Sequence, residues 1–312
     1  RLLVDEGYDV CIVDQRVEGN SFFDKLEQML SEDVLWIGVT AMTGEPVHHS
    51  LDICKFLRTR TTAPLVWGGI HPTILSDSTL EHELVDYVIR GKGERSVLML
   101  SQALQRELEF SQVRGLTYFD SSGCIVHNEE DSDSEWEQLP DVPYNLVDID
   151  DYARVGFEKR VFPIMTSRNC PHKCTFCYNS SLPGKFRWYP DSIEEVKDHL
   201  DRIIRDYEPT YMSFIDDDFF VDRDRAREIL RYYEKVKPTT LKTGFRGVRI
   251  SDLRCLGDDD FDLLERINTV HINIGIESGS DRILKHMRKG MRAKDAIDIN
   301  NRFVRYPNFL PL

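Results

Sequence analysis

The stretch RVFPIMTSRNCPHKCTFCYN, from Arg160 to Asn179, begins as a predicted β-strand and ends in a loop that holds three cysteines. Its first half is an apolar run of strand length that leads directly into the loop. The cysteines are Cys170, Cys174 and Cys177, so eight positions hold three of the chain's seven cysteines. An odd count with one tight cluster indicates metal chemistry in a reducing compartment more than a disulfide framework.

Strand and helix patterns alternate downstream of this loop. The predicted strands are TYMSFID, LKTGFRGVRI and TVHINIGIES, and the predicted helices start at a capping box of Ser192 and Glu195, near residues 223–236, near 259–267 and from 281. The last strand alternates, with Val270, Ile272, Ile274 and Ile276 on one face and His271, Asn273, Gly275 and Glu277 on the other. One face should meet helices and the other a polar interior, as in a barrel.

The first hundred residues contain a second series of this kind. Strands that are apolar on both faces are predicted at residues 9–14, 33–42, 64–70 and 85–91, with helices at 21–30, 47–60 and 94–106 between and after them. This pattern predicts a doubly wound, Rossmann-like parallel sheet with helices on both sides. We expect three parts: this domain at residues 1–110, a hairpin (GLTYFDSSGCIVHN) and acidic linker at 111–155, and the partial barrel at 156–312.

Composition and charge argue against several classes of protein. The 312 residues are 41% hydrophobic and carry a formal charge of −14, which favours a folded protein and argues against a broad nucleic-acid surface. No run approaches the ~20 apolar residues of a membrane span, and no cleavable leader is visible, so we expect a cytoplasmic protein. The chain starts within a helical pattern at Arg1 and stops at YPNFLPL, where a further strand is expected. We therefore expect a fragment truncated at both ends.

Three thiols suit some metal centres better than others. Structural zinc takes four protein ligands, and His172 is the nearest candidate for the fourth, but it lies inside the spacer between Cys170 and Cys174, where binding the same ion would strain the loop. A redox dithiol uses two cysteines. A cubane 4Fe-4S cluster has four irons, so three thiolates leave one iron open to a substrate.

The cysteine spacing, with Phe176 directly before the last cysteine, resembles the signature of the radical S-adenosylmethionine (radical SAM) enzymes. The resemblance implies a partial (β/α) barrel in which the three thiolates hold a 4Fe-4S cluster. SAM would chelate the open iron, contact Phe176, and be split to methionine and a 5'-deoxyadenosyl radical. It also implies an external one-electron donor, such as flavodoxin or ferredoxin.

Further residues are similar to SAM-binding elements of that family. Asp216 and Asp217, in FIDDDFF, end the second strand and resemble an Asp-Asp-x-Phe element for the methionine ammonium; the alternative is a solvated acidic turn. Glu277 and Ser278 end the fourth strand and suit ribose hydroxyls or the methionine group, or form only a strand-to-helix turn. Arg249 resembles the basic position that faces the methionine carboxylate, unless it is a surface residue.

The N-terminal half is similar to the cobalamin-binding domain of cobalamin-dependent radical SAM enzymes, on the segments GVTAMTG, VWGGIHPT and VDYVIRGKGE. Thr40, Met42, Gly68 and Gly69 would then border the pocket for the dimethylbenzimidazole tail, with the glycines allowing close approach to the backbone. The alternative is a ligand-free doubly wound domain. The Asp-x-His-x-x-Gly element that supplies an axial histidine in many cobalamin domains is absent; it would lie upstream of Arg1.

These resemblances predict a radical SAM enzyme that abstracts hydrogen from a small-molecule substrate and then transfers a methyl group from cobalamin. Cofactors would carry this chemistry, and the protein would position them. One alternative is a radical SAM cyclase or rearrangement enzyme whose N-terminal domain binds no cobalamin. An alternative of another class is a non-catalytic binding module that a metal stabilises. The sequence names no residue that acts on the substrate.

Overall fold

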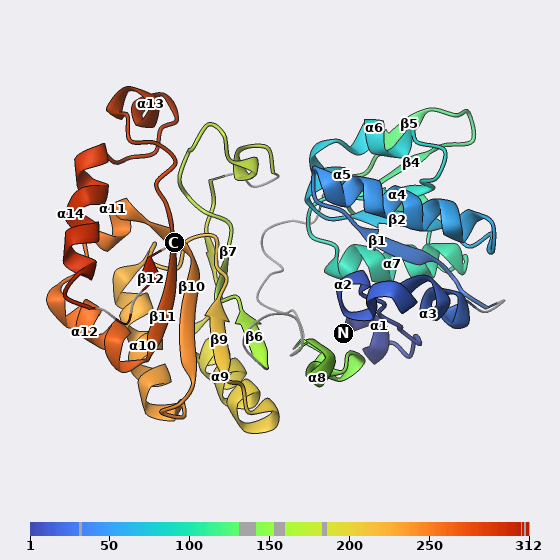
Figure 1. Cartoon of the computed structure of the whole chain (residues 1–312). Helices are drawn as coiled ribbons and strands as arrows, with labels where there is room; N and C mark the ends of the chain where they lie inside the picture. The colour runs from blue at the N-terminus through green and yellow to red at the C-terminus, as the bar shows by residue number, and fades with distance from the viewer. Residues whose placement is uncertain are drawn as a thin grey trace. The chain divides into compact units, whose positions relative to one another are not determined.

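The computed structural model describes residues 1–30, 33–130, 142–152, 160–182, 186–306, 308 and 310–311. The chain divides into two compact units, residues 1–147 and residues 148–180 with 184–312 (Figure 1). Each unit is built on a five-stranded sheet. The predicted acidic linker falls in part on residues 131–141 and 153–155, which lie outside the described residues.

The sheet of the first unit combines parallel strands with a hairpin. Its order follows the sequence: β1 (Ile37–Thr40), β2 (Leu65–Gly68), β3 (Tyr87–Ile89), β4 (Leu116–Phe119) and β5 (Ile125–His127). β1, β2 and β3 pair in parallel, whereas β4 pairs antiparallel with both β3 and β5. The predicted hairpin therefore does more than connect domains, because it extends the sheet.

Helices cover both faces of this sheet. They are α1 (Leu2–Asp5), α2 (Gln15–Glu18), α3 (Phe22–Met29), α4 (Glu45–Arg58), α5 (Ile70–Ile74), α6 (Ser76–Leu80) and α7 (Glu94–Leu104). Leu65 and Trp67 of β2 join the core beneath α3 and α4, whereas Val66 between them joins the core beneath α7 (Figure 1). Because alternate side chains are buried on opposite faces, the predicted doubly wound parallel sheet is confirmed.

One strand prediction in this unit is wrong. Residues 9–14 form no strand, and Cys11 and Ile12 within them are exposed. β1 pairs with β2 alone among the described strands, so residues 9–14 do not pair with its free edge. Apolar composition alone does not make a strand where pairing is missing.

The sheet of the second unit is parallel throughout. β6 (Val161–Ile164), β9 (Tyr211–Phe214), β10 (Lys242–Arg249), β11 (Thr269–Gly275) and β12 (Leu310–Pro311) lie side by side in that order. A separate two-stranded sheet pairs β7 (Ser167–Arg168) with β8 (Tyr189–Pro190). Consecutive parallel strands joined by helices give the predicted partial (β/α) barrel.

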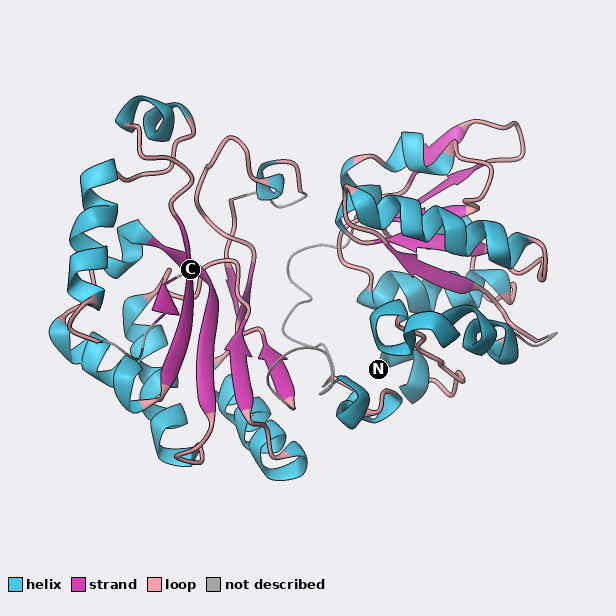
Figure 2. Cartoon of the chain, in the orientation of Figure 1, coloured by secondary structure: helices cyan, strands magenta, loops and turns pink. Residues whose placement is uncertain are grey.

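The helices of the second unit gather along the outside of its sheet, while loops and the short α13 lie at the carboxyl ends of the strands (Figure 2). They are α8 (Ile149–Tyr152), α9 (Ile193–Tyr207), α10 (Arg223–Val236), α11 (Ile250–Leu253), α12 (Asp258–Arg266), α13 (Asp281–His286) and α14 (Ala293–Phe303). Both hydrogen bonds of the predicted capping box open α9, at Ser192 and Glu195. α9 buries Val196, Leu200 and Ile203, one turn or so apart.

An aromatic cluster packs between the sheet and α10. Phe214 of β9 stacks on Phe245 of β10 with ring centroids 5.1 Å apart and meets Tyr233 of α10 edge-on. Phe219, from the loop after β9, contacts both phenylalanines. Full burial of each such ring contributes roughly 1.5–3 kcal/mol. The cluster thus anchors the acidic loop 215–218 to the carboxyl end of the sheet.

The helices in the described part of the chain do not span a membrane. No helix there has the length and apolar composition that crossing a bilayer requires.

Candidate functional site

The three cysteines share one loop beyond the carboxyl end of β6. Cys174 is buried, at 5% exposure, and Cys170 and Cys177 are half-buried. The loop rests on the segment after α13, because the backbone N–H of Thr175 donates to the carbonyl of Met287 at 3.1 Å. The sheet and the chain after α13 therefore fix the loop from two sides.

The thiols fit a polynuclear cluster better than a single ion. Among the described residues, Cys170, Cys174 and Cys177 do not form a group with ligand atoms all within 4.8 Å of one another. Zn–S bonds of ~2.3 Å hold the sulfurs of a zinc site closer together than that. Burial raises the pKa of Cys170 to about 12 and also raises the pKa of Cys177. Binding of iron would therefore release thiol protons.

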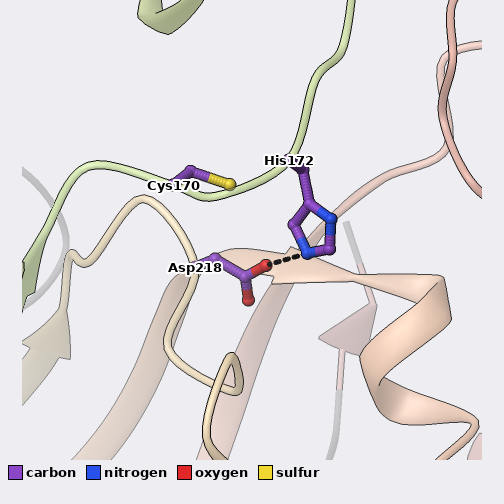
Figure 3. A group of neighbouring side chains, drawn as sticks. All are labelled: Cys170, His172 and Asp218. Carbon is purple, nitrogen blue, oxygen red and sulfur yellow. Dashed lines mark ion pairs between the residues drawn. The ribbon is translucent and has the colours of Figure 1, made fainter. Parts of the chain in front are cut away.

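A different set of ligand atoms does lie that close. Cys170, His172 and Asp218 have ligand atoms within 4.8 Å of one another. Figure 3 shows these three side chains as neighbours. His172 thus lies beside Cys170, but Cys174 is not part of this group, so the strain expected from binding one ion with both cysteines stays a prediction. The imidazole Nε2, however, faces the fully buried Asp218 carboxylate, with 3.3 Å between Nε2 and Oδ2. His172 therefore ties the cysteine loop to the acidic loop.

Arg249 lies inside the site and not on the surface, with 8% of the residue exposed. Its Nη1 donates a hydrogen bond to Cys174 Sγ at 3.1 Å, and its Nη2 donates to the Lys289 carbonyl. Its Nε lies 4.0 Å from Asp218 Oδ2 and donates to Ser251 Oγ at 3.3 Å. The contact with the SAM carboxylate expected of Arg249 stays a prediction, since each guanidinium nitrogen already has a partner in the chain.

A second buried carboxyl group lies beside Asp218. Burial and the Asp218 charge raise the pKa of Asp252 to about 7, and the two side chains are in hydrogen-bond contact. Oδ2 of each is buried and accepts no hydrogen bond from a described donor, although His172 Nε2 lies 3.3 Å from Oδ2 of Asp218. One proton held by Asp252 and donated to Asp218 satisfies both atoms. Sequence reasoning missed this pair, because no spacing links the two residues.

Asp216 is buried and hydrogen-bonded to the chain before the cysteine loop. It is 1% exposed, and its Oδ1 accepts hydrogen bonds from Thr166 N at 3.1 Å, Thr166 Oγ1 at 2.8 Å and Ser167 Oγ at 2.6 Å. These bonds tie the end of β9 to the chain just before the cysteine loop. The predicted contact of Asp216 with SAM is not favoured by this arrangement and stays a prediction.

Asp217 faces the cysteine loop. Its carboxylate accepts hydrogen bonds from Tyr178 Oη at 3.0 Å and Asn179 Nδ2 at 3.3 Å, both directly after Cys177. Gly247 supports this loop closely, because a Cβ there would come within 1.9 Å of the Asp216 carbonyl oxygen. Asp217 thus lies beside the cysteine loop, and its contact with SAM stays a prediction.

Glu277 and a lysine form the other side of the site. Glu277 has a left-handed backbone, φ 65, and its Oε1 lies 2.9 Å from Nζ of Lys289, which is 6% exposed. This Nζ also lies 5.5 Å from the centre of the Phe176 ring, which is 50% exposed. Gly275 leaves room for the pair, because a Cβ there would come within 2.7 Å of Nζ. Ser278 Oγ accepts from the backbone of the following turn.

Lys289 was not anticipated from the sequence. It lies in a turn after α13, far from any motif, and its side chain reaches back to the end of β11. A buried ammonium beside an exposed aromatic ring and a carboxylate is a ready partner for an anionic or amphoteric ligand. Lys289, Glu277 and Phe176 together fit the amino-acid part of SAM.

The residues predicted for cobalamin lie at the ends of adjacent strands. Thr40 pairs with Gly68 across β1 and β2, and Thr40, Met42 and Gly69 are exposed. Gly69 has φ +98, and a Cβ there would come within 3.0 Å of the Ala41 carbonyl oxygen. The exposed backbone with no side chain above it fits the close approach of a nucleotide-like tail. Gly68 itself has ordinary space around it.

Two family models match the chain. The Radical SAM superfamily model covers residues 164–307, and the B12 binding domain model covers residues 1–100. The first range contains the cysteine loop, the acidic loop and the turn with Lys289. The second contains the strand ends with Thr40 and Gly69.

Curated proteins of other organisms match almost the whole of this chain. An uncharacterized methyltransferase of Pyrococcus horikoshii is 29% identical, over 95% of this chain and 63% of the relative. An anaerobic magnesium-protoporphyrin IX monomethyl ester cyclase of Synechocystis is 24% identical, over 99% of this chain and 61% of the relative. The chain thus spans about three-fifths of the length of these relatives.

Solved structures share the fold. The radical SAM methyltransferase TsrM of Kitasatospora setae, with tryptophan and a SAM analog bound, superposes with a TM-score of 0.77 at 19% identity, over 99% of this chain and 62% of that one. The cobalamin-dependent radical SAM enzyme OxsB, with aqua-cobalamin and SAM bound, gives a TM-score of 0.69 at 20% identity, over 90% of this chain and 41% of that one.

Proposed function

The chain belongs to the radical SAM enzymes that carry an N-terminal B12-binding domain, and we propose that it cleaves SAM reductively and transfers a methyl group to an unactivated carbon of a small-molecule substrate. Its cofactors are a 4Fe-4S cluster, SAM and cobalamin. When bound, the cluster supplies the electron that splits SAM to methionine and a 5'-deoxyadenosyl radical, and cobalamin supplies the methyl group.

One observation carries the proposal. Three cysteines of a single loop lie at the carboxyl end of a parallel sheet, where two buried cations, Arg249 and Lys289, approach the same loop. An acidic loop and Glu277 border it, so groups for an amino acid and for a cluster meet at one place. Parallel barrels bind their ligands at this end.

Each side of the site has its own task. Cys170, Cys174 and Cys177 would hold the cluster and leave one iron without a protein ligand. Asp217 and Glu277 would accept hydrogen bonds from the ammonium and hydroxyl groups of SAM, and Lys289 would face its carboxylate. The low exposure of Lys289 strengthens such contacts, because water screens them less.

The first unit would hold cobalamin. Thr40, Met42 and Gly69 would border the nucleotide tail, and the positive φ of Gly69 keeps the backbone at that point free of a side chain. Support comes from the B12-binding model and from the methyltransferases among the relatives. We further propose a cytoplasmic protein that takes its electron from a flavodoxin or ferredoxin; all seven cysteines are free.

Anaerobic reconstitution of the full chain with iron, sulfide and cobalamin tests the proposal. After dithionite and SAM are added, we expect formation of 5'-deoxyadenosine and retention of about one cobalamin per chain. Cys177→Ala should reduce 5'-deoxyadenosine to background, because the cluster loses one of three protein ligands. Cys124→Ala, an exposed cysteine in the hairpin turn, is the matched control and should leave the yield unchanged.

Other outcomes separate the alternatives. A chain with a full cluster that makes no 5'-deoxyadenosine is a binding module, and the proposal fails. A chain that makes 5'-deoxyadenosine but never retains cobalamin is a radical SAM enzyme of another reaction class. With the substrate in hand, a product that has gained a methyl group supports transfer, whereas one that has lost hydrogen and gained no carbon indicates cyclisation.

A further inference from the structure

The position of Arg249 is unusual for a ligand-binding arginine. Its guanidinium is buried, and Nη1 points at a cysteine sulfur, 3.1 Å from Cys174 Sγ. The sulfurs of Cys170 and Cys177 meet neutral donors instead, the backbone N–H groups of His172 and Asn179. Cys174 is also the most buried of the three. One thiolate of the proposed cluster would thus be electrostatically unlike the others.

The guanidinium is fixed in its place by the chain. Nη2 donates to the Lys289 carbonyl, and Nε donates to Ser251 Oγ at 3.3 Å. Asp218, fully buried, lies 4.0 Å from Nε and also faces His172 of the cysteine loop at 3.3 Å. A charged donor held from three directions keeps its hydrogen bond to sulfur at little cost in side-chain freedom.

We propose that Arg249 is a positioning residue of the cluster, which donates a charged N–H···S hydrogen bond to Cys174 and thereby raises the reduction potential. This inference rests on the proposed function, since it needs the cluster on the three cysteines. One-electron reduction adds negative charge to the cluster, and a fixed positive donor at one thiolate stabilises the reduced form more than the oxidised form. Arg249 then acts through Cys174 and does not bind the SAM carboxylate.

Redox titration of the reconstituted chain tests the assignment. Wild type, Arg249→Gln and Arg249→Lys are loaded anaerobically, iron and sulfide per chain are counted, and the reduced cluster is followed by electron paramagnetic resonance. We expect Arg249→Gln to bind a full cluster that is about tenfold harder to reduce, which is ~59 mV for one electron. Arg249→Lys keeps the positive charge but loses the planar guanidinium group. Its reduction potential should therefore lie between those of wild type and Arg249→Gln.

Arg231→Gln is the matched control. Arg231 is exposed on α10, so this variant removes one positive charge from the same unit without touching the cysteine loop. Its potential should equal that of wild type. SAM affinity, measured by equilibrium dialysis, is the second readout. It should be nearly unchanged in Arg249→Gln, because each guanidinium nitrogen of Arg249 already has a partner in the chain.

The outcomes are distinct. An unchanged potential with SAM affinity lost tenfold or more overturns the inference and restores Arg249 as a carboxylate ligand, while the proposed function stands. Loss of the cluster from both Arg249 variants also overturns it, because Arg249 would then be needed to retain iron. A wild-type chain that binds no four-iron cluster defeats the proposed function itself and the inference with it.

Discussion

At the scale of single residues, the buried Asp252 gives the chain a specific pH dependence. Burial and the Asp218 charge raise the pKa of Asp252 from 3.8 to about 7, whereas the unfolded chain ionises it near its usual value. Between about pH 4 and pH 7 the folded chain holds a proton that the unfolded chain has released. This group therefore lowers the free energy of unfolding as the pH rises through that window.

Asp252→Asn should remove this effect. We expect the cluster-free variant to be more stable than wild type at pH 8 by roughly 1–3 kcal/mol, with the difference shrinking as the pH falls to 4. Urea unfolding at several pH values measures it. Asp259→Asn, on the exposed side of α12, controls for the loss of a carboxylate. A difference for Asp252→Asn that stays constant from pH 4 to pH 8 would contradict the shared proton.

Gly69 offers a test of the cobalamin site. Gly69→Ala places a Cβ within 3.0 Å of Ala41 O and Thr40 Oγ1, where the tail of the cofactor is expected. We expect cobalamin retention to fall at least tenfold, as measured by absorbance after desalting. Gly123→Ala is matched in backbone strain, with φ +82, but a Cβ there has nothing within 4 Å. Equal retention in both variants would show that the strand end is not the binding site.

The sequence predicted the cysteines and their chemistry because ligand spacing is local. It located Asp217 and Glu277 but could not show how they are held, because Glu277 turns into a left-handed conformation that strand alternation does not foresee. It missed Lys289 and gave Arg249 a different partner. Both depend on contacts between segments about 75 or more residues from the cysteine loop, such as Arg249 with Cys174, and no pattern within one segment records them.

At the scale of elements, the first turn of α9 shows how much a capping box contributes to stability. Ser192 Oγ accepts from Glu195 N at 3.2 Å, and Glu195 Oε2 accepts from Ser192 N at 2.9 Å. Ser192→Ala breaks this capping box and should lower the free energy of unfolding by ~1 kcal/mol. Ser280 begins α13 without a side-chain cap, so Ser280→Ala should change stability much less. Urea unfolding of both variants measures these free energies of unfolding. An equal decrease in the two variants would contradict the role of the capping box.

The predicted helices were correct where local patterns determine them, whereas predicted strands also depend on pairing with a neighbour. α9 starts at Ile193, directly after the predicted capping residue Ser192, and α10 spans Arg223–Val236, where a helix was predicted. The run at residues 9–14 failed, because a strand needs a neighbour and composition cannot supply one. The hairpin β4–β5 was predicted as a hairpin, but its pairing with β3 was not, since register across distant segments is set by tertiary packing.

At the scale of the molecule, two units with separate sheets predict two separable unfolding events. In calorimetry of the reconstituted chain, cobalamin at 100 times its Kd should stabilise one transition by about 2.7 kcal/mol, and SAM should stabilise the other. A single transition that both ligands move equally would contradict the assignment of one cofactor to each unit. Gly69→Ala should abolish the shift caused by cobalamin alone.

The fold class was within reach of the sequence because two kinds of period alternate along almost the whole chain. Apolar runs such as LVWG, at Leu65–Gly68, bury residues on both faces, which is typical of parallel sheets between helices. The substrate was out of reach, since no periodic or spacing pattern describes a small molecule. The same limit applies to the choice between methyl transfer and cyclisation.

The strand order of the second sheet also affects how the site assembles while the chain is being synthesised. Its strands lie side by side in the order of synthesis, so a nascent chain presents β6 and the cysteine loop before β10 and the turn with Lys289 exist. The thiols therefore leave the ribosome without Arg249 or Lys289 to cover them, open to oxygen and to stray metal ions. The complete set of side chains around the thiols accordingly forms only when β10 and the turn with Lys289 have joined the sheet.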